Sequence, residues 1–376
     1  MNRLPVLGIA LLLLISLPLL GVKLADQSVK DYLEFPPRTH FVAHAAFSWP
    51  VFAGLSLVIV AVLSSFLIRI SRCLSSLHNK EVRSPDTRRP FPWWGWLGAG
   101  WTLCAWILAW NRFSWMTPFQ SWTFTPLWIG YIVVINAWTF VRSGTSTLME
   151  RPANFAALFP LSAVFWWLFE YLNRFVQNWY YARAGELSPL DYFLQASIPF
   201  STVLPAVVST DQLLATVPRL SCGLDRGPAL VIRHARRGAL AIVLLAGAGL
   251  MGLGVQPNWL FPLVWVAPLV LIVGVQVLAG QSTIFEPLER GDWRPIWTAA
   301  LASLICGIFW ELWNWRSLAH WSYAIPYVDR FHLFAMPLLG YAGYLPFGLE
   351  CLVVADFVLM KDKTGHEAAR VAPPHC

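Results

Sequence analysis

Ten apolar stretches dominate this chain, and each is about long enough for a helix to cross the ~30 Å hydrocarbon core of a bilayer. Only 12% of the 376 residues are charged, whereas soluble domains carry about 25%. This scarcity of charge excludes a disordered chain and argues strongly against a soluble enzyme. The pattern predicts an all-α, polytopic membrane helix bundle with about ten transmembrane helices, at roughly 4–22, 47–68, 94–111, 125–141, 156–179, 196–217, 238–255, 260–279, 296–315 and 336–359.

Lysine and arginine are distributed unevenly between the loops that join these stretches. With the N-terminus inside, 19 of the 27 basic residues fall in inner loops and termini, and 7 fall in outer loops. Because cytoplasmic loops collect basic residues, we expect a multi-pass protein of the plasma (inner) membrane with both termini cytoplasmic. The net charge of +7 then reflects these loops, and no nucleic-acid partner is expected. Residues 1–25 also have features of a signal peptide, but Lys23 stands where a cleavage site needs a small residue, which favours a retained helix.

Several short stretches of the chain match one another at a nearly constant spacing. Gly144 to Glu150 matches Gly280 to Glu286, and the pair Glu170-x-x-Asn173 matches Glu311-x-x-Asn314. Each copy would contain four helices, and an even number of crossings gives both copies the same orientation, so we expect parallel repeats. The predicted organisation is two N-terminal helices with a basic loop (1–92), a first repeat (93–217), a basic linker (218–232), a second repeat (233–360) and a cytoplasmic tail (361–376).

The glycine at the start of each matched stretch is followed by a Thr-x-x-Glu spacing, at Thr147 to Glu150 and at Thr283 to Glu286. A glycine commonly ends a helix, and Thr-x-x-Glu is the spacing of a capping box at the start of the next one. The pattern therefore predicts a turn and a helix cap, with anion binding at the new helix N-terminus as the alternative.

Four carboxylates fall inside the predicted spans: Glu170, Asp211, Glu311 and Glu350. At ~1.5 Å per residue, each is expected about 21–22 Å from the surface where its helix starts, in the middle third of the membrane. An ionisable group there costs at least ~2.5–3.5 kcal/mol, so it normally faces a bundle interior or a wet cavity. Such groups can transfer protons, or they can act as polar clamps between helices. Arg174 follows Glu170 by one helical turn and is expected to pair with it, which favours the clamp for that residue.

The second half of the chain has the features more typical of a working site, because residues 336–350 are rich in proline and glycine and end at a buried acid. For the aromatic residues at the outer helix ends, the alternative role is anchoring at the membrane interface. For the asparagines the alternative is packing between helices, and for the histidine it is simple solvation in a loop. The predicted catalytic residues are Glu311, Glu350, Asn314 and His320. The residues predicted to bind substrate are Trp310, Trp313, Trp321, Tyr341, Tyr344, Glu170, Asn173 and Asp211.

The six cysteines give no recognisable pattern. None forms a C-x-x-C pair, and none falls in a predicted outer loop, so neither a metal site nor a disulfide is expected. The chain also lacks a P-loop, a dinucleotide fingerprint, an H-E-x-x-H pair and a Gly-x-Ser-x-Gly elbow. These absences argue against ATP-driven transport, NAD chemistry, zinc proteolysis and serine hydrolysis, and no cofactor is expected.

Three functions fit these features. The first is a membrane enzyme that processes a lipid or isoprenoid by acid/base chemistry, with aromatic faces stabilising a developing cation. The second is a proton- or ion-coupled transporter of a small or lipidic substrate. The third is a non-catalytic membrane subunit. The expected partners are membrane lipid and a lipidic or small-molecule substrate, and the sequence does not indicate an oligomeric state.

The space around Glu311 and Glu350 would distinguish these three functions. An aromatic-lined pocket that opens to lipid favours the enzyme. A wet path to an aqueous face favours the transporter. Paired acids without a cavity favour the subunit.

Overall fold

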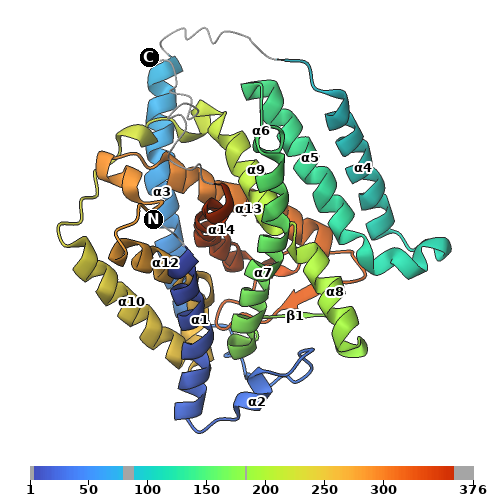
Figure 1. Cartoon of the computed structure of the whole chain (residues 1–376), viewed down its shortest axis with the longest axis vertical. Coiled ribbons are helices and arrows are strands. Elements are labelled where there is room, and N and C mark those ends of the chain that lie inside the picture. Colours follow the sequence, from blue (N-terminus) through green and yellow to red (C-terminus); the bar gives the residue numbers. More distant parts are fainter. Residues whose placement is uncertain (1–3, 79–88, 183, 360–376) are drawn as a thin grey trace.

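The computed structural model describes residues 4–78, 89–182 and 184–359, and these are mostly helical (Figure 1). The all-α prediction is confirmed. Within the described part, eight helices or helix pairs are long and apolar enough to cross a membrane, and a bent pair adds a ninth. The eight are α1 (Leu4–Leu24), α3 (Trp49–His78), α5 (Phe124–Ser143), α7 (Pro152–Val176), α8 with α9 (Pro189–Phe200 and Val203–Ala215), α10 (Ala235–Gly252), α13 (Arg294–Asn314), and η7 with α14 (Leu338–Gly343 and Tyr344–Leu359).

Two of the ten predicted spans are not among these eight. The span predicted at 260–279 is broken, because α11 and η5 (Pro257–Leu260 and Phe261–Trp265) meet α12 (Ala267–Leu278) at an angle of 56°. Pro268 lies in the first turn of α12, where a missing N–H is tolerated and a new helix can begin. The remaining helix, α4 (Trp93–Trp110), contains six tryptophans, whose polar indole N–H makes them only weakly hydrophobic, and it is not among the candidate spans.

The centre of the molecule is formed by the four helices α7, α9, α13 and α14. Helix α9 packs between α7 and α13, and α14 contacts all three. On one side of this centre lie α5 and then α4, and on the other lie α12, α10 and α1 (Figure 1). Large side chains fill the centre without exposure, among them Phe169, Leu204, Trp313 and Phe347. This dense apolar packing fixes the helix ends that carry the polar residues described below.

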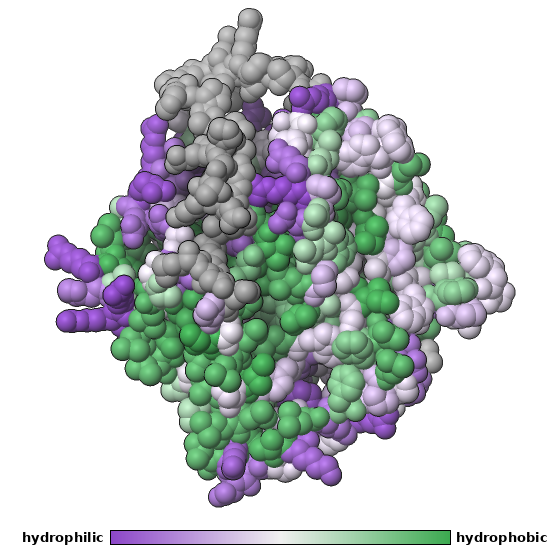
Figure 2. All heavy atoms as spheres, viewed as in Figure 1, coloured by the Kyte–Doolittle hydropathy of each residue, from purple (hydrophilic) through white to green (hydrophobic). Residues whose placement is uncertain are grey.

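The surface of the molecule is that of a protein surrounded by lipid. Apolar side chains cover the middle of the face shown in Figure 2, and hydrophilic side chains gather at its lower edge and upper left. Helix α3 buries none of its most apolar window, and Leu57 and Val58 are 71% and 61% exposed. A soluble protein rarely exposes such an extended apolar surface, so an integral membrane protein is the consistent interpretation.

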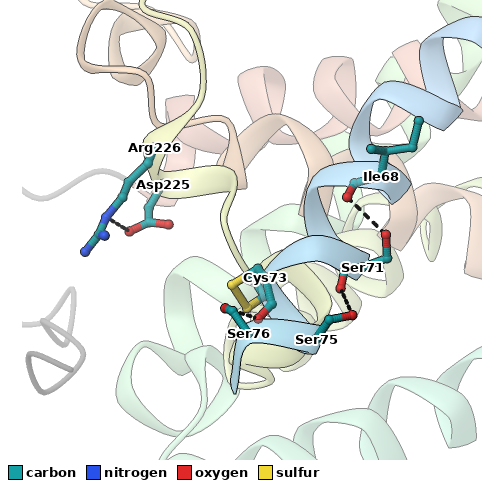
Figure 3. The surroundings of a disulfide bond; sticks show 8 residues. Ile68, Ser71, Cys73, Ser75, Ser76, Asp225 and Arg226 are labelled. Atoms are coloured by element: carbon teal, nitrogen blue, oxygen red, sulfur yellow. Dashed lines mark hydrogen bonds and ion pairs between the residues drawn. A yellow bond between two sulfur atoms is a disulfide. The ribbon is translucent and has the colours of Figure 1, made fainter. Parts of the chain in front are cut away.

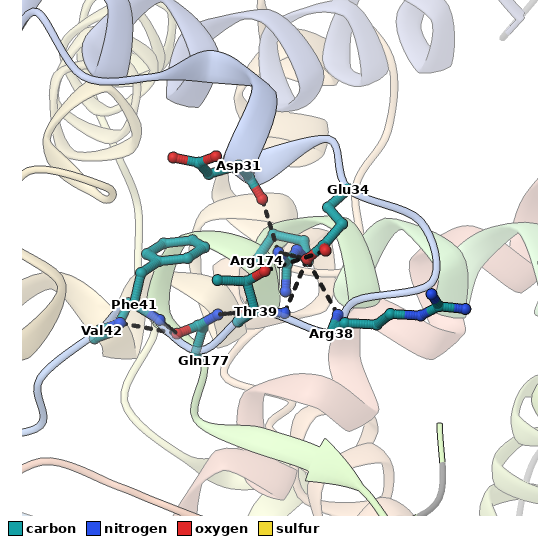
Figure 4. Close-up of polar contacts among 8 residues, drawn as sticks. All are labelled: Asp31, Glu34, Arg38, Thr39, Phe41, Val42, Arg174 and Gln177. Carbon is teal, nitrogen blue, oxygen red and sulfur yellow. Dashed lines mark hydrogen bonds and ion pairs between the residues drawn. The ribbon is translucent and has the colours of Figure 1, made fainter. Parts of the chain in front are cut away.

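An extended strap, residues 33–48, follows the short helix α2 (Val29–Tyr32) and crosses one end of the central helices, here called the strap end. Gln177 follows α7 in the left-handed conformation, and its Oε1 accepts the N–H groups of Phe41 and Val42, each at 2.9 Å (Figure 4). The Nε2 group of Gln177 donates to the carbonyl oxygen of Thr39 at 2.9 Å. Farther along, Asn258 of α11 accepts the N–H of Ala45 at 2.9 Å. The strap is thus tied to α7 and to the broken span.

A short antiparallel strand pair joins the two halves of the chain at the strap end. Strand β1 (Trp179–Tyr181) follows α7, and strand β2 (Trp321–Tyr323) follows α13. Trp179 lies opposite Tyr323, and Tyr181 lies opposite Trp321. Each strand therefore begins with a tryptophan and ends with a tyrosine, and the pairing is symmetric about its centre.

The prediction that the chain has no disulfide is wrong. Cys73 of α3 and Cys222 form a disulfide with their Cα atoms 5.7 Å apart (Figure 3). Cys222 lies between η3 (Pro218–Ser221) and η4 (Leu224–Arg226), at the end of the molecule opposite the strap, here called the linker end. The two cysteines are 149 residues apart, so no local spacing could signal the bond.

The two glycine-led stretches end helices as expected, but they do not form capping boxes. Gly144 has a φ of +86° and ends α5, and Gly280 has a φ of +68° just after α12. The short helix α6 (Thr147–Glu150) begins after Ser146, and the side chain of Gln212 accepts the N–H of Thr147 at 2.9 Å. A residue of α9 therefore supplies the contact that the sequence pattern assigned to Glu150.

Candidate functional site

Glu311, in the last turn of α13, is fully buried, and one of its oxygens lies inside a cage of three donors. Its Oε1 accepts hydrogen bonds from the hydroxyl of Tyr323 at 2.6 Å, the hydroxyl of Tyr344 at 3.1 Å and the indole N–H of Trp321 at 3.4 Å. Burial and the adjacent carboxyl raise the pKa of Tyr323 well above its usual value, so this phenol remains a donor. The second carboxyl oxygen of Glu311, Oε2, has no hydrogen-bond partner among the described residues.

Glu170, near the end of α7, has a matching cage. Its Oε1 accepts hydrogen bonds from the hydroxyl of Tyr181 at 2.6 Å, the indole N–H of Trp166 at 2.9 Å and the indole N–H of Trp179 at 3.0 Å. Burial and Glu170 together raise the pKa of Tyr181 well above its usual value. Both glutamates lie within the last two turns of their helices, toward the strap end.

Arg174 contacts the strap and not, as the sequence spacing predicted, Glu170. Its guanidinium lies 3.5 Å from Oε2 of Glu34 and 2.7 Å from the carbonyl oxygen of Asp31 (Figure 4). Glu34 also accepts the N–H groups of Thr39 at 2.9 Å and Arg38 at 3.1 Å. Burial opposes ionisation of Glu34, but these hydrogen bonds and Arg174 together lower its pKa below the usual value.

The two asparagines of the Glu-x-x-Asn pairs hold the strands in place. Asn173 donates to the carbonyl oxygen of Trp179 at 2.7 Å and accepts the N–H of Asn178 at 2.8 Å. Asn314 donates to the carbonyl oxygen of Trp321 and accepts its N–H, both at 2.8 Å. Each asparagine therefore fixes the strand whose tryptophan and tyrosine donate to the glutamate one turn earlier. These contacts position the two strands.

An aromatic core lies between the two glutamate cages. Trp166 lies 6.4 Å from Trp310, Trp310 stacks on Tyr344 at 5.8 Å, and Tyr181 lies 6.5 Å from Trp321, measured between ring centroids. These rings carry donors for both carboxyls or pack against them. The two cages are consequently parts of one buried unit at the strap end.

Glu350 and Asp211 lie apart from this unit. Glu350, in α14, is fully buried, and its Oε1 accepts the N–H of Leu269 at 3.0 Å. Leu269 is the third residue of α12, so the carboxyl satisfies an N–H that the broken span leaves free and meets the positive end of the helix dipole. Asp211 is half-buried near the linker end of α9. The structure therefore does not bring the four predicted acids together.

A cavity of about 220 Å³ lies beside Glu170, between the strap, the end of α7 and β1. His40 packs edge-on against Tyr180, with ring centroids 5.6 Å apart, at the mouth of this cavity. The cavity is thus lined by one carboxyl, one imidazole and two guanidinium groups, together with aromatic rings. Its lining includes Arg38 and His40 from the strap, Glu170 and Arg174 from α7, and Trp179 and Tyr181 from β1.

Of the residues predicted from sequence, only Glu170 and Asn173 line this cavity. His320 contacts the carbonyl oxygen of Leu318 at 3.2 Å, and Tyr341 donates to the carbonyl oxygen of Leu333 at 3.0 Å. Trp313 packs against Trp128 on the far side of α13, at 5.0 Å between ring centroids. Trp310, Trp321 and Tyr344 belong to the Glu311 cage and the aromatic core.

No sequence pattern points to Arg38, His40 or Gln177, because the strap reaches the site only through long-range folding. A local signal did exist for part of the site: Trp-x-Tyr follows Glu-x-x-Asn in both halves, at Trp179 and at Trp321. Interface anchoring was one of the roles considered for these aromatic residues, whereas both tryptophans donate hydrogen bonds to the glutamates.

Within the described residues, no group of three or more His, Cys, Asp or Glu side chains could hold a metal ion. No protein-family model, no curated protein and no solved structure matches this chain. The geometry of the site is therefore the basis for its functional interpretation.

Proposed function

We propose that this integral membrane protein binds the polar headgroup of a membrane lipid in the cavity beside Glu170 and acts on it by acid/base chemistry. The observation that carries this proposal is the cavity itself, because it combines Glu170, His40, Arg38 and Arg174 around a space of about 220 Å³. That volume suits a headgroup, whereas the acyl chains would remain in the lipid that surrounds the apolar helices.

Three of the groups around the cavity have distinct roles in this proposal. Arg38 is exposed at the rim, and a guanidinium is well suited to bind a phosphate through paired hydrogen bonds. Glu170 is held rigidly by three donors, and together with the rings of Trp179 and Tyr181 it would receive a positively charged amine. Histidine is the usual proton carrier near neutral pH, which gives His40 the acid/base role. A zwitterionic phospholipid presents both the phosphate and the amine.

Two further predictions of the sequence analysis belong to this proposal. The excess of basic residues at the linker end supports an outward-facing strap end, so the lipid would come from the outer leaflet. The equivalent contacts of Glu170 with Tyr181 and of Glu311 with Tyr323 support a duplicated unit. The first half of the chain would then carry the site and the second half would be its scaffold. The sequence features had favoured a site in the second half.

A transporter is the second candidate, and the broken span favours it. Discontinuous helices with a charged group at a half-helix N-terminus are common at the substrate and ion sites of transporters. Glu350 occupies such a position on α12. Uptake into vesicles that depends on an ion gradient and on Glu350 would support this candidate over the enzyme.

The test uses the full chain in detergent, with dilute short-chain phosphatidylethanolamine as the probe. Binding is measured by calorimetry and lipid conversion by mass spectrometry. We expect Arg38→Gln to weaken binding about tenfold or more, because a hydrogen bond to a charged group contributes ~1.5–3 kcal/mol. We expect His40→Gln to retain binding and lose conversion. His332→Gln is the matched control, since His332 lies at the strap end but pairs with Asp329 at 2.8 Å.

Two outcomes would contradict the proposal. Equal binding of phosphatidylethanolamine by the wild type and Arg38→Gln would show that the cavity is not the headgroup site. Binding by the wild type without chemical change of the lipid would show that the protein is not an enzyme for it.

A further inference from the structure

A second cavity lies at the linker end, far from the strap. It has a volume of about 420 Å³ and separates α3 from the segment that follows Cys222. Its lining residues from α3 are Ser65, Ile68, Arg69 and Arg72, and Gly223 forms the opposite wall. The spacing of the four α3 residues is that of a single helix face, so both arginines belong to the same wall.

Among the described residues, nothing neutralises the positive charge of this cavity. No acidic side chain is among its described lining residues, and neither Arg69 nor Arg72 forms an ion pair with any residue that the structure describes. The nearby acid Asp225 pairs with Arg226 at 3.7 Å, on the side of the segment that faces away from α3 (Figure 3). Two guanidinium groups on one wall of a hollow are suited to bind a phosphate.

The position of the arginines along α3 corresponds to the level of lipid headgroups. Arg69 follows the first residue of α3, Trp49, by 20 residues, or about 30 Å of helix, which is the thickness of the hydrocarbon core. One turn before Arg69, Phe66 packs against Trp293 and Trp297, with ring centroids 6.0 and 5.1 Å apart. Tryptophans concentrate at membrane interfaces, so both observations place the cavity at that depth.

In the oxidised form of the protein, as purified in air, the disulfide fixes the separation of the two walls. Cys73 directly follows Arg72, and Cys222 directly precedes Gly223. Gly223 has a φ of +74°, and a Cβ atom there would lie 3.0 Å from the Cβ of Cys73, so only glycine fits this close approach without strain. A site whose walls are held in this way loses little conformational freedom when a ligand binds.

We propose that this cavity binds the phosphate of an anionic phospholipid from the leaflet at the linker end. The assignment is independent of the proposed function, because it uses other residues at the opposite end of the molecule. The shared chemistry, a phosphate between two arginines, could also be met by a soluble phosphate compound, and the experiment distinguishes the two sources.

The experiment measures lipids retained by the full chain with native mass spectrometry after reconstitution in equal amounts of phosphatidylglycerol and phosphatidylcholine. We expect the wild type to retain phosphatidylglycerol at least tenfold over phosphatidylcholine, and the double variant Arg69→Gln/Arg72→Gln to lose this preference. The matched control is Arg226→Gln/Arg233→Gln, which removes two exposed charges at the same end outside the cavity. A second variant, Cys73→Ser/Cys222→Ser, keeps both arginines and is expected to weaken the preference.

Three outcomes would overturn the proposal. One is an equal retention of both lipids by the wild type. Another is an equal loss in the control variant, which would indicate diffuse attraction of charge. The third is competition by glycerol phosphate at the affinity of the lipid, which would assign the cavity to a soluble phosphate compound.

Discussion

The hydroxyl of Tyr181 lies 2.6 Å from Oε1 of Glu170 and donates a hydrogen bond to it, which joins β1 to the end of α7. Tyr323 makes the same contact with Glu311 at the same distance. The two contacts belong to one aromatic unit, yet only the first borders the cavity that Arg38 and His40 complete. This difference between the two halves is the basis of the functional proposal.

Replacement of either tyrosine by phenylalanine tests the structural part of this unit. Tyr181→Phe and Tyr323→Phe each remove a donor to a buried carboxyl, so we expect each to lower the free energy of unfolding by ~1–3 kcal/mol. Tyr180→Phe is the control, because its side chain is exposed and donates no hydrogen bond to either glutamate. Denaturant titration in detergent measures the effect, and unchanged stability in both variants would contradict the cage.

Acidification should release the strap. The pKa of Glu34 is lowered in the folded protein, so its contribution to stability is fully present above the usual value of about 4.3 and is lost as the pH falls through the lowered pKa. We expect the protection of residues 33–48 against hydrogen exchange, corrected for the intrinsic exchange rate, to fall in that acidic range in the wild type. In Glu34→Gln the protection should be low already at neutral pH, whereas Glu289→Gln, which replaces an exposed acid on η6 (Glu286–Arg290), should behave as the wild type. Protection that is independent of pH would show that Glu34 does not hold the strap.

Glu350 is expected to stabilise the broken span through its contact with Leu269. Glu350→Gln keeps an oxygen that can accept the N–H of Leu269, so stability and lipid binding should stay close to those of the wild type. Glu350→Ala leaves that N–H unsatisfied in a buried position, which costs ~1–3 kcal/mol before the loss of packing is counted. Thermal unfolding separates the two variants. Loss of lipid binding in a folded Glu350→Gln protein would show that Glu350 takes part in the functional site.

The state of Cys73 and Cys222 in cells tests the orientation of the chain. The distribution of basic residues assigns the linker end to the cytoplasm, where thiols are kept reduced. We therefore expect rapid acid quenching and alkylation to find both thiols free, and to find them bonded after purification in air. A pair that is bonded in quenched cells would assign the linker end to the outside.

The membrane class and most helix positions could be predicted from sequence, because about 20 consecutive apolar residues have few alternatives to a helix in lipid. The break before Pro268 was not predicted, and the carboxyl that satisfies the N–H of Leu269 there comes from another helix, α14. The cysteine pair was missed for the same reason, as it joins residues 149 positions apart.

The candidate site was predicted in part. Glu170 and Glu311 were found because buried acids are rare in apolar spans, and their partners were not, because β1 and β2 reach them only after the chain turns back. The helical spacing of Glu170 and Arg174 suggested an ion pair, but the strap offers Arg174 a closer carboxylate, that of Glu34. The direction of a long side chain is decided by such tertiary contacts and not by helical spacing alone.

The most direct test compares Glu170→Gln with Glu311→Gln. The two glutamates have equivalent donor cages, so each substitution disturbs the fold in the same way, but only Glu170 borders the cavity. The measurement is the binding of short-chain phosphatidylethanolamine by calorimetry, on variants whose unfolding transitions confirm that they are folded. We predict that Glu170→Gln weakens binding about tenfold or more and that Glu311→Gln binds as the wild type does. Loss of binding in Glu311→Gln with binding retained in Glu170→Gln would contradict the account.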